Sequence, residues 1–147
     1  MKIYKKYIMI LSAILLIGIT GCKKHHSLPK VPSPTWTVDN TGKYPVSMTV
    51  VVQVPENLRT YLQESDKIAA FVGDECRGTG TWIHTGNVSA FFILIHGTSS
   101  EQSKIRIKYY FSWKSAMYET APFLNFTVDG NYGSVDAPQI LDLKPVK

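Results

Sequence analysis

The feature that most constrains the fold of this chain is a succession of short runs of β-branched and aromatic residues, separated by turn-forming residues, from residue 46 onward. In Lys104–Phe111, charged and apolar residues alternate almost strictly, which predicts a strand with one buried and one solvated face. Residues 88–96 are almost entirely apolar, which predicts a central strand buried on both faces. No helical period of useful length follows the N-terminal apolar stretch, so we expect an all-β fold.

The same composition predicts the remaining strands, which are residues 46–54, 67–72, 76–83, 116–119, 123–128 and 139–143. Pro55 ends the first of them, and Gly73-Asp74-Glu75 predicts a hairpin turn. Residues 56–65 are polar and are expected to form a loop or one short helical turn. Short strands joined by frequent turns predict an antiparallel β-sandwich of immunoglobulin-like type.

The first residues have the order of charge and apolarity that marks an export signal. Lysines at the start precede an apolar stretch at residues 8–19, which is shorter than the ~20 residues of a membrane span. We therefore expect a signal peptide at residues 1–21. The alternatives are an uncleaved anchor and a plain secretory signal.

Small residues directly before Cys22 resemble the lipobox of bacterial lipoproteins. The resemblance implies that Cys22 becomes the first mature residue and carries a lipid on its thiol, so that the membrane is a partner. We expect residues 22–35, which are rich in proline and charge, to form a flexible tether. The folded domain is expected at residues 36–147.

The distribution of charge excludes nucleic acid as a partner. The net charge is +5, but six of the sixteen basic residues lie in the signal and the tether. From Val31 onward ten basic residues face eleven acidic ones, so the domain is near neutral.

Catalytic and metal-binding patterns are missing from the sequence. No spacing typical of a zinc or calcium site is present, and neither a nucleophile elbow nor a glycine-rich phosphate loop occurs. We therefore expect no enzymatic activity, no cofactor and no metal site. With Cys22 lipidated, Cys76 has no disulfide partner, and alternation predicts that it points inward with Gly78 while Arg77 faces solvent.

Aromatic residues are the remaining candidates for binding. Trp113 lies in a Ser-Trp-Lys-Ser sequence that predicts a turn, and Tyr132 lies between Asn131 and Gly133. Strand aromatics usually fill the core, whereas a ring on a turn is free to contact a ligand. We therefore expect Trp113 and Tyr132 to be the binding residues.

Two stretches, residues 66–78 with Ala-Ala-Phe-Val-Gly and Lys104–Phe111 followed by Met117-Tyr118, resemble a β-sandwich module of Bacteroidetes-type envelope lipoproteins. The resemblance implies a lipid-anchored protein of the cell envelope, located at the outer membrane. Residues 23–26, Lys-Lys-His-His, lack the acidic residues that send such lipoproteins to the outer face. The periplasm-facing orientation therefore stays open.

Together these features predict a non-enzymatic binding or adhesion module that acts through protein–protein contacts with an envelope partner. The alternative is a carbohydrate-binding module that holds a glycan on exposed aromatic rings. The sequence leaves the ligand, the orientation and the oligomeric state open.

Overall fold

The computed structural model describes residues 27–39 and 41–147, so the expected signal peptide and Cys22 lie outside the described residues. Strands dominate this part of the chain, as expected for an all-β fold. The elements are β1 (Val46–Gln53), α2 (Glu56–Arg59), β2 (Lys67–Val72), β3 (Glu75–Thr85), β4 (Val88–Gly97), β5 (Lys104–Phe111), η1 (Ser112–Lys114), β6 (Ala116–Glu119), β7 (Leu124–Asn125), β8 (Asn131–Tyr132), β9 (Gln139–Ile140) and β10 (Lys144–Pro145). No helix within the described ranges is long and apolar enough to span a bilayer.

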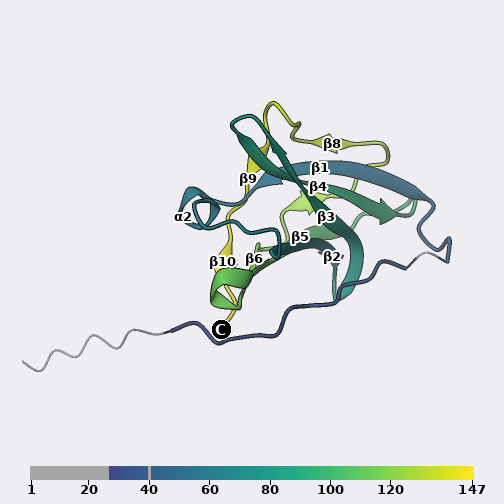
Figure 1. Cartoon of the computed structure of the whole chain (residues 1–147). Helices are drawn as coiled ribbons and strands as arrows, with labels where there is room; N and C mark the ends of the chain where they lie inside the picture. The colour runs from purple at the N-terminus through teal and green to yellow at the C-terminus, as the bar shows by residue number, and fades with distance from the viewer. Residues whose placement is uncertain (1–26, 40) are drawn as a thin grey trace, which may run out of the picture.

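The strands form one curled sheet in the order β10-β6-β5-β2-β3-β4-β1-β8. Strand β3 causes the curl, because its first part pairs with β2 and its second part pairs with β4. In Figure 1 the ribbon of β3 bends between these two parts, so that β1 and β4 lie across from β2 and β5. A Cβ at Gly80, near the bend, would lie 2.1 Å from Cγ2 of Ile68, which explains why glycine occupies this position.

The core lies between the facing parts of the sheet. Alternating residues of β1, β2, β4 and β5 point into it, namely Val50, Val52, Ile68, Ile93, Ile95, Ile105, Ile107 and Tyr109. Each is almost completely buried, and burying one such aliphatic side chain stabilises a fold by roughly 1.5–3 kcal/mol. The alternation predicted for β5 is confirmed. Strand β4, expected to be buried on both faces, is buried on one, because Leu94 on its outer side is 39% exposed.

Two short strands depart from the expected antiparallel arrangement. Strands β8 and β9 pair parallel to β1, and β8 lies in a segment expected to be a loop. The strand expected at residues 123–128 is reduced to β7. After β7, which pairs with β5, the chain crosses to β1, and β8 and β9 then run beside β1 in the same direction.

The C-terminal segment closes the gap between the two ends of the curled sheet. Strand β9 pairs with β1, and β10 pairs with β6 only a few residues later. We call this closure the seam.

A β-bulge at the start of β3 reverses the orientation expected for Cys76 and Arg77. Ala70 is opposite Gly78 but Phe71 is opposite Cys76, so one residue of β3 has no partner. Strict alternation fails there, and Cys76 packs with Phe71 in a second, smaller cluster. The prediction that Cys76 is buried is confirmed, and burial raises the pKa of its thiol.

The prediction that Arg77 faces solvent is wrong, since its side chain is only 7% exposed. Its Nη1 lies 3.2 Å from Oε2 of Glu101 and also donates to the carbonyl of His96. Its Nε lies 3.3 Å from Oε2 of Glu75 without hydrogen-bond alignment. The guanidinium carbon is 3.5 Å from the ring centroid of Tyr44, so a stacked ring and two carboxylates compensate the buried charge.

The N-terminal segment, residues 27–39, runs along the outside of the sheet (Figure 1). The amide of Val31 donates to the carbonyl of Ser115 at 2.7 Å, and Nζ of Lys67 donates to the carbonyl of Pro34 at 2.7 Å. Trp36 meets Phe71 edge-to-face at 5.7 Å. The part of the expected tether that the structure describes therefore contacts the domain before Trp36.

Candidate functional site

The structure places the two candidate binding residues on separate surfaces. Trp113 lies on η1, which precedes β6, whereas Tyr132 lies beside Thr120, which directly follows β6. The two surfaces therefore lie at opposite ends of β6.

At the first surface Trp113 is 50% exposed, as its position on a turn predicted. Tyr61, which is 47% exposed, lies flat against it, with the ring centroids 4.4 Å apart and the planes 1° from parallel. We call this pair the aromatic stack. Nζ of Lys114 lies 5.2 Å from the Trp113 centroid, so a cation accompanies the rings.

Asp66 fixes the position of the aromatic stack. Its buried carboxylate accepts hydrogen bonds from the Tyr109 hydroxyl at 2.6 Å and from the Ser112 amide at 2.9 Å. It also accepts from the amide of Gln63, on the loop that carries Tyr61. Burial, together with the neighbouring Asp66, raises the pKa of the Tyr109 hydroxyl. One carboxylate thus joins both halves of the stack to the core.

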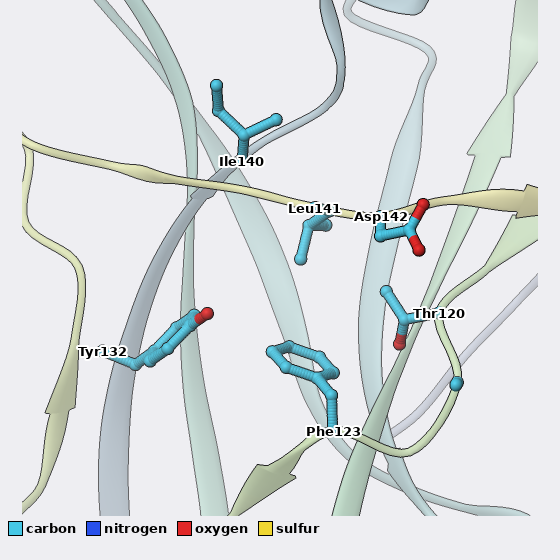
Figure 2. A pocket seen from close by; sticks show the side chains of 7 residues that line it. Thr120, Phe123, Tyr132, Ile140, Leu141 and Asp142 are labelled. Carbon is cyan, nitrogen blue, oxygen red and sulfur yellow. The ribbon is translucent and has the colours of Figure 1, made fainter.

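The second surface is a hollow of about 230 Å³ at the seam, which we call the seam pocket. It is lined by Thr120, Ala121, Phe123, Tyr132, Ile140, Leu141 and Asp142. Figure 2 shows the rings of Phe123 and Tyr132 facing each other below Leu141, with Thr120 and Asp142 to one side. The two rings meet edge-to-face with centroids 5.8 Å apart.

Pairing with β1 holds both walls of the seam pocket. Tyr132 is opposite Val50, and the amide of Leu141 donates to the carbonyl of Gln53 at 2.9 Å. Gly133 follows Tyr132 with a φ of 76°, and a Cβ there would lie 2.3 Å from the carbonyl oxygen of Val51. Only glycine lets the chain lie this close to β1.

Two of the large exposed apolar side chains line the seam pocket. Seven large hydrophobic side chains are exposed in the described ranges, and four of them belong to residues 123–140. These four are Phe123 at 36%, Val128 at 39%, Val135 at 38% and Ile140 at 65% exposure. Of these four, Phe123 and Ile140 line the seam pocket, and neighbouring exposed apolar residues mark a contact site more strongly than scattered ones do.

Sequence reasoning selected Trp113 and Tyr132 but missed their neighbours. Tyr61 lies in a polar loop far along the chain from Trp113, and Phe123 was assigned to a regular strand. Hydroxyl, carboxylate and aromatic groups line the seam pocket, which suits binding. Among the described residues, no group of three or more histidine, cysteine, aspartate or glutamate side chains is placed to hold a metal ion.

No family model, no curated protein and no solved structure matches this chain. The residues of the two surfaces are therefore the source of information on function.

Proposed function

We propose that this protein is a lipid-anchored, non-catalytic binding module of the cell envelope, which holds a protein partner at the seam pocket. The observation that carries the proposal is that the exposed apolar side chains of Phe123 and Ile140 line this hollow. Cys22 supplies the anchor, and the outer membrane is the proposed location.

The chemistry of the seam pocket favours an apolar side chain of a partner. Phe123, Ile140 and Leu141 supply apolar walls, and Asp142, at the side, is paired with Lys144 at 2.6 Å. Protein interfaces commonly have this arrangement, with an apolar centre inside a charged rim. A partner that inserts one large side chain would obtain most of its binding energy there.

A carbohydrate ligand is the second candidate, and one observation favours it. The rings of Phe123 and Tyr132 stand beside the hydroxyl of Thr120 and the carboxylate of Asp142. A sugar presents an apolar face and hydroxyl groups, which such a combination accommodates. The Thr120 hydroxyl already accepts a hydrogen bond from the Ile107 amide, which reduces its capacity for a sugar.

For the fold we propose an immunoglobulin-like β-sandwich. The inner faces of β1 and β4 pack against those of β2 and β5 around one core, which supports two facing layers. Strand β3 belongs to both layers.

The lipid anchor predicts that labelled palmitate enters the wild-type chain in a Gram-negative host. The Cys22→Ser variant should take no label and should leave the membrane fraction, because no other thiol is available at the cleavage site. Cys76→Ala is the matched control and should keep both the label and the location. A wild-type chain without label contradicts the anchor.

The seam pocket predicts that Ile140→Lys weakens partner binding by at least about tenfold, or ~1.4 kcal/mol. Ile140 is 65% exposed, so the substitution places a charge at the contact without disturbing the core. Leu94→Lys, at an exposed position on β4, is the control and should bind normally.

The partner is first isolated from envelope extract by crosslinking to the wild-type chain, and its affinity for each variant is then measured with purified proteins. The same chains are applied to a glycan array. Glycan binding that Ile140→Lys abolishes would replace the protein partner by a sugar. Equal affinities of the two variants for the isolated protein would exclude the seam pocket.

A further inference from the structure

The first described residues lie beside the turn that carries the aromatic stack. The amide of Val31 donates to the carbonyl of Ser115, two residues after Trp113. Ser27, Leu28 and Pro29 line a hollow together with Lys147. Figure 1 shows the described chain beginning at the side of the molecule where the C-terminus lies.

The length of chain before Ser27 limits how far Cys22 lies from this region. Five residue steps separate Cys22 from Ser27, and an extended chain spans at most ~3.3–3.6 Å per residue. Cys22 is therefore within about 18 Å of Ser27. A lipid on Cys22 brings this end of the domain to the membrane surface.

The side chains at this end suit the boundary between lipid and water. Tyr61 and Trp113 are half exposed, and rings with one polar atom favour the headgroup region of a bilayer. Exposed lysines lie on the neighbouring segments, and their long aliphatic stems let the charge reach the phosphates. These lysines are Lys30, Lys114 and Lys147. Glu64 is an exposed acidic group on the Tyr61 loop, while Asp66 is buried.

We infer that the aromatic stack rests in the headgroup layer of the phospholipid membrane that holds Cys22. The inference extends the proposed lipid anchor and assigns the aromatic stack to lipid, not to a protein or a glycan. The anchor and the rings form two attachments, which fix the orientation of the domain. The seam pocket lies at the other end of β6, so a membrane contact at the aromatic stack leaves it open to its partner.

The test measures whether Trp113 touches headgroups. The full chain carrying Trp36→Phe and Trp82→Phe, in which Trp113 is the remaining tryptophan, is reconstituted in vesicles of phosphatidylethanolamine and phosphatidylglycerol. Some of the lipids carry a nitroxide on the headgroup, which quenches a neighbouring indole. We expect the emission of Trp113 to fall and to shift to shorter wavelength.

The matched chain keeps Trp82 and carries Trp36→Phe and Trp113→Phe. Trp82 packs against the core and donates to Ser89, so its emission should stay unchanged. If the double variants fold poorly, Trp113→Phe alone is compared with the wild-type chain and should abolish the quenching. Unquenched Trp113, or equal quenching of Trp113 and Trp82, overturns the inference.

Failure of the anchor and failure of the contact are separated by a second attachment. Cys22 is coupled to a maleimide lipid in the vesicle, which needs no acylation by the cell. The buried thiol of Cys76 leaves Cys22 as the accessible target. Quenching in these vesicles, without palmitate labelling in the host, keeps the membrane contact and rejects the native anchor. Palmitate labelling in the host, without quenching in these vesicles, keeps the native anchor and rejects the membrane contact of the aromatic stack.

Discussion

Asp66→Ala is expected to lower the free energy of unfolding by about 3 kcal/mol, because a buried donor that loses its acceptor costs roughly 1–3 kcal/mol. The substitution leaves one buried donor, the Tyr109 hydroxyl, and one half-buried donor, the Ser112 amide, without their carboxylate. It also releases the Gln63 amide on the Tyr61 loop. Urea unfolding, followed by tryptophan fluorescence, measures the change.

Asp142→Ala removes an exposed carboxylate whose partner is also exposed, and it serves as the control. Its unfolding midpoint should match that of the wild type, because exposed ion pairs contribute little. The unfolding midpoint of Tyr109→Phe should lie between those of the two variants, since Asp66 still accepts the hydrogen bonds from the amide and hydroxyl of Ser112. If Asp66→Ala were as stable as Asp142→Ala, the carboxylate would have no structural role.

Arg77→Leu is expected to cost about 3–5 kcal/mol, the usual effect of removing one partner from a buried ion pair. Glu101, whose side chain is 10% exposed, would keep its charge without the guanidinium, and the Tyr44 ring would lose its stacked cation. Arg106→Leu is the control, because Arg106 is more exposed and its ion pairs are longer, at 3.5 and 3.6 Å. It should cost less than about 1 kcal/mol.

The pH dependence adds a second readout. Hydrogen bonds from Ser103, and more weakly the Arg77 charge, hold the pKa of Glu101 below its ordinary value of 4.5. A depressed pKa in the folded state gives stability that is present above 4.5 and is lost as the pH falls through the folded pKa. The difference in the free energy of unfolding between the wild type and Arg77→Leu should therefore become smaller at acidic pH. Glu101→Gln in the Arg77→Leu background should recover part of the lost stability. A stability difference that stays constant with pH would reject the Arg77–Glu101 ion pair.

The sequence predicted the elements that depend on a repeated pattern. Strands β1, β4 and β5 follow from their β-branched residues and alternation, and the turn at Trp113 follows from polar neighbours. Each of these predictions depends on several consecutive residues, so a single exception within the run does not change the element that forms.

Features that depend on one residue or on distant contacts were missed. A single unpaired residue turned Cys76 to the outer face, and no local composition distinguishes this bulge from regular strand. Arg77 is buried because Tyr44 and Glu101, distant in sequence, meet it. Tyr61 likewise reaches Trp113 only because Asp66 joins their two loops. Two-residue strands such as β8 have no pattern to detect.

The course of the N-terminal segment has a mechanical consequence. A pull on its N-terminal end reaches the Val31–Ser115 hydrogen bond first, then the Lys67–Pro34 bond and last the contact between Trp36 and Phe71. A load would break these contacts one after another, because residues 27–39 lie outside the sheet and share no strand pairing with it. Peeling would uncover the cluster of Phe71 and Cys76, so that a maleimide dye in solution would form a thioether with Cys76 only in chains that have been under tension.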